Sequence, residues 1–377
     1  MRPIQMVDLK QQYQKIKPEV DAAVMEVLES CAFINGPQVQ RFATALAAYN
    51  GVTHVIPCAN GTDALQIAMM ALGLKPSDEV IAPSFTYIAT TEVIALLGLK
   101  TVFVDVDPKT FCIDVEAIEA AITSKTRAIV PVHLYGQAAD MERIMALAEK
   151  HNLFVIEDNA QAIGCDYTFS NGHAQKTGSI GTVGCTSFFP SKNLGGYGDG
   201  GAMMTNDDKL AETLRMVANH GQSKRYYHDL VGCNSRLDTI QAAVLEVKLK
   251  QLDAYIAARQ KVAHFYDAAF ADHKNITTPF RSPKSNHVFH QYTLVLEGLD
   301  RDALNAYLAA RNIPSMIYYP VPAHRQQMFA TSGVTVNLPV TDWLTERVIS
   351  LPIHTEMDEE QLQAIISSVL AFADTNK

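Results

Sequence analysis

Short hydrophobic runs alternate, along the N-terminal half of the chain, with longer segments in which apolar side chains recur at helical spacing. Runs of four or five residues suit strands, and the segments between them suit amphipathic helices. Strands that alternate with helices pair mainly in parallel and are covered by helices on both faces. The pattern therefore predicts an α/β fold with strands at 54–58, 79–82, 101–105, 128–132 and 153–156.

The flanking patterns predict further helices and a second, smaller domain. At 377 residues the chain is too long for one small core. A turn signal, Asn35-Gly36-Pro37, separates two amphipathic segments at 18–30 and 37–50, and a long helix over 235–263 would join the domains. Beyond it we expect strands at 291–297 and 315–319 and helices at 301–310 and 359–372. We place the large domain at 1–245 and the small domain at 246–377.

The composition is that of a globular enzyme, and it narrows the classes of partner. The chain is 48% hydrophobic and 19% charged, and its formal net charge of −9 argues against general affinity for nucleic acid or an anionic membrane. No run approaches the ~18 apolar residues of a membrane helix, so we expect a cytoplasmic protein. The six cysteines lie far apart without a C-x-x-C pair, so no metal site and no disulfide framework is predicted.

Polar and aromatic residues come directly after the first two predicted strands, at the edge of the sheet where ligands bind in such folds. Gly61 and Thr62 open a helix, and a glycine, a hydroxyl and free amides suit a phosphate group. The alternative is that Thr62 or Asp63 only caps the helix. The ring of Tyr87 either lies on a planar cofactor or belongs to the core.

Asp158 comes after the fifth run, and Gln161 lies three residues further on. A carboxylate in this position can keep a pyridine nitrogen protonated, which makes the ring an electron sink. One alternative is a surface or capping role for Asp158. Another is a magnesium site in an ATPase, but the chain has no G-x-x-x-x-G-K-[ST] loop to hold the nucleotide.

Lys192 stands between an apolar, proline-containing run and a glycine-rich stretch. Partial burial would disfavour its ammonium form, lower its pKa and free the amine to form a Schiff base with an aldehyde such as pyridoxal phosphate (PLP). Ser187, five residues earlier, would bind the same phosphate as Thr62. The alternative is that Lys192 is an ordinary solvated lysine.

Six motifs together resemble the PLP-dependent sugar aminotransferases of the DegT/DnrJ/EryC1/StrS family, and the resemblance covers nearly the whole chain. It implies the fold-type-I, aspartate aminotransferase-like architecture, with a small α/β C-terminal domain. The motifs are NGTDAL at 60–65, PSFTYIAT at 83–90, IEDNAQ at 156–161, SFFPSKNLG at 187–195, GDGG at 198–201 and NSRLDTIQAA at 234–243.

The resemblance assigns roles around the cofactor ring. It implies that Lys192 holds PLP as a covalent internal aldimine and that Asp158 pairs with the ring nitrogen. Gln161 would donate a hydrogen bond to the ring oxygen, and Tyr87 would stack on the ring. Lysine at 192 favours transamination, because relatives with histidine there dehydrate the sugar instead.

The resemblance also implies a shared phosphate site. Gly61, Thr62 and Ser187 would bind the cofactor phosphate from one subunit, and Asn234 would reach it from the neighbouring subunit of a homodimer. L-glutamate would give its amine and leave as 2-oxoglutarate. The resulting pyridoxamine phosphate would pass the amine to a nucleotide-linked keto-sugar.

The segments around 187–201 and 220–238 look most like the branch that aminates C3 of UDP-2-acetamido-2-deoxy-3-oxo-glucuronic acid for bacterial surface polysaccharide (O-antigen and lipopolysaccharide). Arg236 would then pair with the uronate carboxylate, or alternatively form an interface salt bridge. Arg225 and His228 belong to a basic, aromatic stretch that either binds pyrophosphate or is a solvated loop. Tyr318 and Tyr319 resemble the stretch that lines the sugar pocket, although many relatives have histidine where Tyr318 stands.

Other substrates and classes stay open at this point. The alternative sugars are dTDP-linked 3-keto-6-deoxyhexoses and nucleotide-linked 4-keto-6-deoxyhexoses. A PLP-binding regulatory protein on the same scaffold is the non-enzyme alternative. Such a protein would be expected to lose Lys192, Asp158 or the phosphate-binding hydroxyls, and this chain keeps them.

Overall fold

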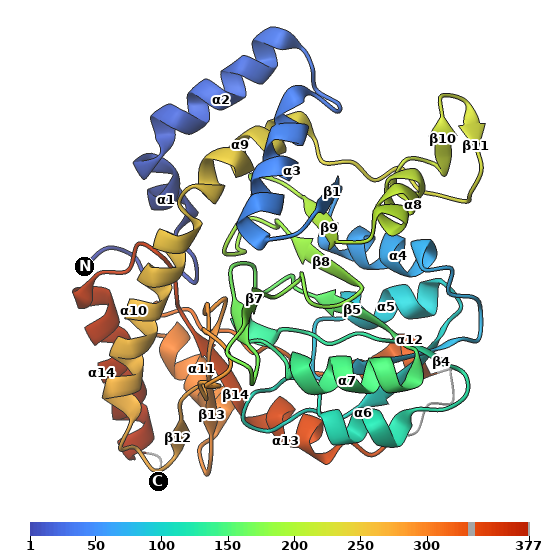
Figure 1. Ribbon diagram of the computed structural model, residues 1–377. Coiled ribbons are helices and arrows are strands. Elements are labelled where there is room, and N and C mark those ends of the chain that lie inside the picture. Colours follow the sequence, from blue (N-terminus) through green and yellow to red (C-terminus); the bar gives the residue numbers. More distant parts are fainter. Residues whose placement is uncertain (331–335, 376–377) are drawn as a thin grey trace.

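The computed structural model describes residues 1–330 and 336–375. Its centre is a seven-stranded sheet of order β1-β9-β8-β5-β4-β2-β3 (Figure 1). Strands β3, β2, β4, β5 and β8 pair in parallel, and β9 runs antiparallel to both β8 and β1, so the expected mainly parallel sheet is confirmed. The strands are β1 (His54–Cys58), β2 (Glu79–Pro83), β3 (Lys100–Val104), β4 (Thr126–Ile129), β5 (Phe154–Asp158), β8 (Val183–Ser187) and β9 (Gly201–Thr205).

Successive side chains of each strand enter two hydrophobic cores, one on each face of the sheet. In β2, Ile81 belongs to one core, and Val80 and Ala82 belong to the other. Helices cover both faces, as the alternating pattern predicts. The first core is covered by α3 (Pro37–Asn50), α6 (Val115–Ala121), α7 (Met141–His151) and α9 (Thr239–Leu249). The second is covered by α4 (Gly61–Ala71), α5 (Ala89–Leu96) and α8 (Asp208–Ala218).

The N-terminal segment forms α1 (Leu9–Lys15) and α2 (Lys17–Ser30), and α2 lies against α9. Helices α2 and α3 confirm the predictions at 18–30 and 37–50. Both carry proline in the first turn, where its missing N–H leaves no helical hydrogen bond unmade.

The C-terminal part forms a three-stranded antiparallel sheet with its own core. The central strand β13 and the helices α11 and α14 confirm the predictions at 291–297, 301–310 and 359–372. The proposed domain boundary at 245/246 falls inside the helix α9. The division of the chain into a large and a small domain stays a prediction. The elements are α10 (Leu252–Phe270), β12 (Ile276–Thr277), β13 (Tyr292–Leu296), α11 (Arg301–Ala309), α12 (Gln327–Ala330), α13 (Pro339–Arg347), β14 (Val348–Leu351) and α14 (Glu359–Thr375).

The prediction of one helix over 235–263 was wrong. The segment forms two helices, α9 and α10, and the second continues to Phe270. The first begins only at Thr239, because the amide of Thr239 donates to the Phe33 carbonyl (3.1 Å) and Asp238 is extended. The break lies at Lys250 and Gln251, where the Gln251 amide bonds the Lys248 carbonyl (3.0 Å) in the tighter i to i−3 pattern.

The prediction of a strand at 315–319 was also wrong. Met316 makes a single bridge to Ser350 of β14, with both backbone hydrogen bonds formed (3.1 and 2.7 Å), and the pairing ends there. Prolines stand at 320 and 322, and proline cannot donate to a ladder. The chain instead turns so that Tyr318 and Tyr319 line a cavity.

Several elements were not predicted at all. They include β8 and β9, which flank the segment with Lys192, the helices α1, α8, α12 and α13, the strands β12 and β14, and two small hairpins. The hairpins pair β6 (Asp166–Thr168) with β7 (Ala174–Lys176) and β10 (Gln222–Lys224) with β11 (Tyr227–His228). Figure 1 shows the second hairpin projecting from the molecule beside α8.

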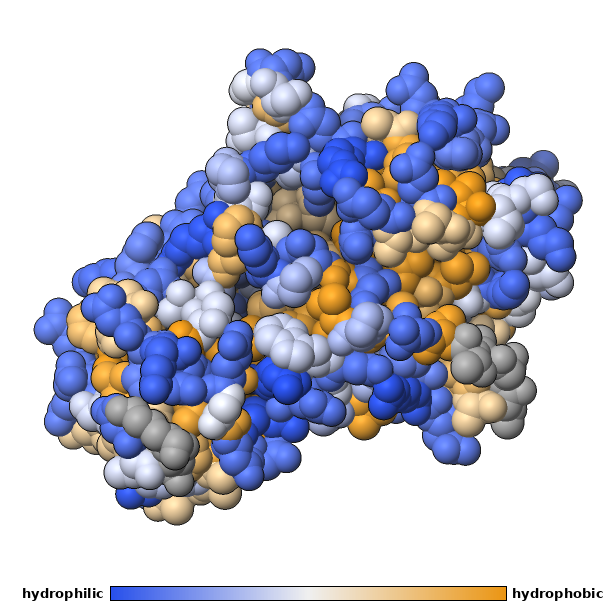
Figure 2. Space-filling model, turned by 90° about the horizontal axis from the view of Figure 1, so that it is seen from below, coloured by the Kyte–Doolittle hydropathy of each residue, from blue (hydrophilic) through white to orange (hydrophobic). Residues whose placement is uncertain are grey.

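The surface agrees with the charged composition. On the face shown in Figure 2, hydrophilic residues predominate and hydrophobic ones lie in patches between them. Among the described residues, no helix combines the length and apolar character needed to cross a membrane.

Candidate active site

A cavity of about 660 Å³ lies at the carboxyl ends of the parallel strands. Its walls come from the segments after β1, β2, β5 and β8 and from two segments of the C-terminal part, around 290 and around 318. This is the edge at which α/β sheets bind ligands. Of the residues singled out from the sequence, it is lined by Gly61, Thr62, Tyr87, Asp158, Gln161, Ser187, Lys192, Tyr318 and Tyr319.

Lys192 lies on the connection between β8 and β9 and is partly buried. Its amide donates to the Phe189 carbonyl (2.8 Å), and the turn is so tight that a Cβ at Gly195 would lie 2.3 Å from the Pro190 carbonyl oxygen. Burial lowers the pKa of Lys192 to about 8, although the charge of Asp158 acts in the opposite direction. Near neutral pH the side chain therefore has a much larger neutral, nucleophilic fraction than an ordinary lysine.

Asp158 is the last residue of β5 and is only 6% exposed. Its Oδ1 accepts a hydrogen bond from the Ala160 amide (3.1 Å), and its Oδ2 accepts one from the Thr90 hydroxyl (2.8 Å). The pairing of Asp158 with Cys185 places the end of β5 beside β8, which leads to Lys192. An acid and an amine thus share one cavity.

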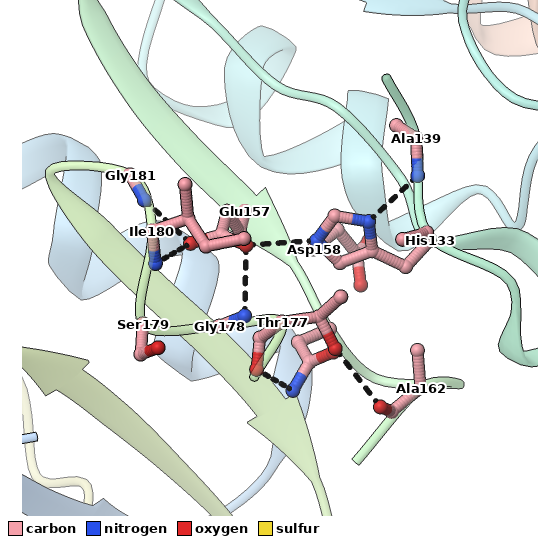
Figure 3. Close-up of polar contacts among 12 residues, drawn as sticks. His133, Ala139, Glu157, Asp158, Ala162, Thr177, Gly178, Ser179, Ile180 and Gly181 are labelled. Carbon is pink, nitrogen blue, oxygen red and sulfur yellow. Dashed lines mark hydrogen bonds and ion pairs between the residues drawn. The ribbon is translucent and has the colours of Figure 1, made fainter. Parts of the chain in front are cut away.

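The neighbouring Glu157 is fully buried (Figure 3). As the residue before Asp158 in β5, it directs its side chain to the opposite face of the strand. Its Oε1 accepts hydrogen bonds from the amides of Ile180 and Gly181 (2.7 and 2.6 Å), and its Oε2 accepts one from the Gly178 amide (2.8 Å). A buried carboxylate persists only with such partners. Glu157 therefore holds the turn that leads into β8 against the end of β5.

His133 gives Glu157 a fourth hydrogen bond, from Nε2 to Oε2 (2.9 Å; Figure 3). The Ala139 amide donates to Nδ1 of the same ring (3.1 Å), so the ring proton resides on Nε2. The backbone amide of His133 also donates to the Asp158 carbonyl (3.1 Å). The segment after β4 and the end of β5 are thereby fixed to each other directly behind Asp158.

Gln161 is held at both ends of its amide. Its Oε1 accepts from the Tyr135 amide (2.7 Å), and its Nε2 donates to the Tyr319 hydroxyl (3.0 Å). An amide nitrogen carries two protons, so one N–H stays available to a ligand in the cavity. Burial raises the pKa of Tyr319, which keeps its hydroxyl protonated.

The segment after β1 forms a tight corner against β8. A Cβ at Gly61 would lie 2.7 Å from Cβ of Ser187, so only glycine fits there. The helix cap is Asn60, whose side chain accepts from the Asp63 amide (2.8 Å), so neither Thr62 nor Asp63 provides the cap. No hydrogen bond is made by the amides of Gly61 and Thr62 within the described chain, and together with the hydroxyls of Thr62 and Ser187 they suit a phosphate.

Tyr87 does not belong to the core. Its side chain is 57% exposed, lines the cavity, and lies 6.2 Å, centroid to centroid, from the ring of Tyr319 at an angle of 44°. The ring is therefore free to cover a planar ligand.

Four predicted residues lie outside this cavity. Asn234 and Arg236 line a second cavity of about 390 Å³, which shares Asp199 with the first. Arg225 and His228 lie at the projecting hairpin, where Arg225 packs against the ring of Tyr226 (5.1 Å) and His228 bonds the His220 carbonyl (2.9 Å). Within one chain these four do not meet Lys192.

The cavity also contains residues that the motifs did not identify. His290 is buried, and burial together with the charges of Lys192 and Arg259 holds its pKa well below the usual value. Gln291 lies beside it, and Thr86 and Ser191 sit within segments that the motifs do cover. The position of Thr86 shortly after a predicted strand could have identified it as a site residue. His290 lies before the strand β13, so the rule that ligands bind after strand ends does not identify it.

A corner with free amides and hydroxyls that suits a phosphate, a partly buried lysine and a carboxylate at the strand ends of an α/β sheet define the site of a PLP-dependent aminotransferase. A model of the DegT/DnrJ/EryC1/StrS aminotransferase family matches residues 14–370, and the chain belongs to this family. The names of its relatives and the match to solved structures show that the chain is a PLP-dependent sugar aminotransferase.

Three relatives are 46% identical to this chain. One is the UDP-2-acetamido-2-deoxy-3-oxo-D-glucuronate aminotransferase of Pseudomonas aeruginosa, with 97% of this chain and 99% of that protein covered. Another is the UDP-N-acetyl-3-dehydro-alpha-D-glucosamine 3-aminotransferase of Acidithiobacillus ferrooxidans, with 97% of each covered. The third is a pleiotropic regulatory protein of Geobacillus stearothermophilus, with 98% of each covered.

Solved structures agree with the fold over nearly the whole chain. A family aminotransferase from Brucella abortus is 43% identical with a TM-score of 0.93, covering 98% of this chain and 99% of that one. DesV of S. venezuelae in complex with a ketimine intermediate is 38% identical with a TM-score of 0.94, covering 99% of both. NtdA of Bacillus subtilis with bound cofactor PMP is 28% identical with a TM-score of 0.91, covering 99% of this chain and 86% of that one.

The buried carboxylate of Glu157 generates a stability prediction. We expect Glu157→Gln to lower the free energy of unfolding by about 3 kcal/mol or more, because the new amide must turn its own N–H toward one of four donors. Urea unfolding monitored by circular dichroism measures the change. The control is Glu119→Gln, which removes an exposed pair with Lys150 and should change stability little. Equal stability of the two variants would contradict the structural role of Glu157.

Proposed function

We propose that this enzyme transfers the amine of L-glutamate to C3 of UDP-2-acetamido-2-deoxy-3-oxo-glucuronic acid, for bacterial surface polysaccharide such as O-antigen. The observation that carries the proposal is the single cavity in which the amine of Lys192, the carboxylate of Asp158 and the corner at Gly61 meet. The cytoplasmic location expected from the sequence stays a prediction.

PLP, when bound, supplies an aldehyde that links to amines and a ring that draws electrons from the adjacent carbon. Lys192 is the residue proposed to hold the aldehyde. Its amine, once free, takes a proton from the α-carbon of glutamate and later delivers a proton to the sugar carbon. Asp158 holds the ring nitrogen, the remaining N–H of Gln161 bonds the ring oxygen, and Tyr87 covers the ring face.

The phosphate end of the proposal includes a second subunit. Gly61, Thr62 and Ser187 bind the phosphate from one side, and Asn234 of a homodimer is proposed to reach it from the other. In support, Asn234 is exposed beside a cavity wall that contains Ile34, and Phe33 and Ile34 are 43% and 52% exposed. Apolar side chains exposed at this level beside a polar cavity are typical of a protein interface.

The sugar is proposed from the relatives and from Arg236. Two of the relatives are named for amination at C3 of UDP-linked 2-acetamido sugars. Arg236 is partly buried and lines the adjoining cavity. No salt bridge of Arg236 is found among the described residues, so its guanidinium is available to a carboxylate. Tyr318 and Tyr319 border the sugar, and Arg225 and His228 of the projecting hairpin are proposed to bind the pyrophosphate of the partner's substrate.

A regulatory protein is the second candidate, because one relative of the same identity carries that name. A protein that regulates by binding alone does not need the lowered pKa of the Lys192 amine or the phosphate-binding corner at Gly61, so these features favour the enzyme. A sugar nucleotide of the 3-keto- or 4-keto-6-deoxyhexose type is the alternative substrate within the same enzyme class.

Replacement of the proposed lysine tests the reaction class. We expect Lys192→Ala to bind PLP but to form no 2-oxoglutarate from glutamate, because no side chain remains to link the aldehyde or move the proton. Stopped assays of 2-oxoglutarate and the visible absorption of the protein measure both properties. The matched control is Lys248→Met, since Lys248 is also buried but lies outside the cavity. Full turnover of Lys192→Ala would refute the mechanism.

A panel of amino-sugar nucleotides run in reverse with 2-oxoglutarate tests the substrate. We expect the 3-amino uronate to react fastest, and Arg236→Gln to slow it about tenfold to a hundredfold while sparing the analogue without the carboxylate. Arg225→Gln should slow both sugars alike, because both carry pyrophosphate. A 6-deoxy product that reacts when the uronate does not would show that the assignment of Arg236 is wrong.

A further inference from the structure

Thr90 is fully buried in the first turn of α5, outside the walls of the cavity, and its hydroxyl touches the acid of the site. Its Oγ1 lies 2.8 Å from Oδ2 of Asp158. The other carboxylate oxygen, Oδ1, accepts from the Ala160 amide (3.1 Å). The two oxygens are thus held from two different elements, one by the chain after β5 and the other by the helix after β2.

The direction of the hydrogen bonds is set by the chemistry of the groups. A hydroxyl has one proton to donate, and an ionised carboxylate can only accept. Thr90 therefore donates to Asp158, and its oxygen is left to accept from the hydroxyl of Thr86, 3.2 Å away. Thr86 itself lines the cavity, so a chain of two hydroxyls runs from the cavity wall to the back of the acid.

The contact fixes a torsion that is otherwise soft. Rotation of an aspartate carboxylate about its last bond has broad, roughly two-fold preferences, so one backbone hydrogen bond leaves the plane poorly defined. A second donor on the other oxygen sets the plane and leaves the remaining lone pairs directed elsewhere, including toward the cavity that Asp158 lines.

We propose that Thr90 is a positioning residue for the transamination, which orients the Asp158 carboxylate toward the ring nitrogen of the cofactor. The inference rests on the proposed role of Asp158. Thr90 lies outside the cavity walls, so it would act only through the acid. Its loss should therefore weaken cofactor binding and slow the proton transfers, with little change in the binding of the sugar.

The chain offers a matched control at the next position. Thr91 is also fully buried in the first turn of α5, but its hydroxyl donates to the Ile88 carbonyl (3.2 Å) within the helix. Thr90→Val and Thr91→Val each remove one buried hydroxyl from the same turn. A purely structural effect would appear in both variants.

The experiment compares Thr90→Val, Thr90→Ser and Thr91→Val as holoenzymes. The measurements are the dissociation constant of PLP, the visible absorption of the bound cofactor across pH, and kcat and KM for both substrates. We expect Thr90→Val to lower kcat and weaken PLP binding about tenfold or more, Thr90→Ser to restore both to within about threefold, and Thr91→Val to resemble the parent. If Thr90→Val does not fold, Thr90→Ala takes its place.

Asp158→Asn separates the two claims. If Thr90 acts through the acid, Thr90→Val should have its effect in the parent but almost none in the Asp158→Asn background. An impaired Asp158→Asn together with a Thr90→Val that matches Thr91→Val would overturn the inference and leave the proposed role of Asp158 standing. An Asp158→Asn enzyme with the absorption, PLP affinity and turnover of the parent would overturn both.

Discussion

The buried carboxylate of Glu157 is the constraint on which the rest of the site depends. Its four hydrogen bonds tie the end of β5 to the turn that leads into β8 and to the segment after β4. The turn packs so closely on β8 that a Cβ at Gly184 would lie 2.1 Å from the Gly178 carbonyl oxygen. With both strands fixed in register, Asp158 at the end of one and the Lys192 segment after the other face the same cavity.

Burial alone does not distinguish the proposed cofactor lysine from another buried lysine of this chain. Burial lowers the pKa of Lys192 to about 8 and the pKa of Lys248 to about 7. Lys248 packs against the ring of Tyr197 (5.3 Å), and the nearby charge of Arg259 lowers its pKa further. Among the described lysines, Lys192 is the one that lines the cavity with an acid, a phosphate corner and an exposed aromatic ring. The neighbours of the amine, more than its pKa, define the chemistry.

Positions at the ends of strands were the most predictable from the sequence. Gly61, Tyr87 and Asp158 stand at or just after the ends of hydrophobic runs, and parallel pairing brings such positions to one edge. The break between α9 and α10 gave no such signal, because neither glycine nor proline marks Lys250 and Gln251.

Other features depend on contacts that no local pattern encodes. The segment at 315–319 contains the β-branched and aromatic residues typical of a strand. Its route is set instead by the prolines after it and by the hydroxyl of Tyr135, which bonds the Tyr318 carbonyl. Thr90 lies in a motif, yet the role proposed for it depends on a contact with a residue 68 positions away. Asn234 and Arg236 lie in a neighbouring cavity, so their proposed roles require a second subunit or a ligand that spans both cavities.

The measurement that tests the account most directly is chemical trapping of the cofactor. Borohydride reduction of the PLP-loaded protein, with subsequent proteolysis and mass spectrometry, identifies the lysine that holds the aldehyde. The account predicts a single labelled peptide, the one that contains Lys192, and no label when the same treatment is applied to Lys192→Ala. Label on Lys248 or on any other lysine, with Lys192 unmodified, would contradict it.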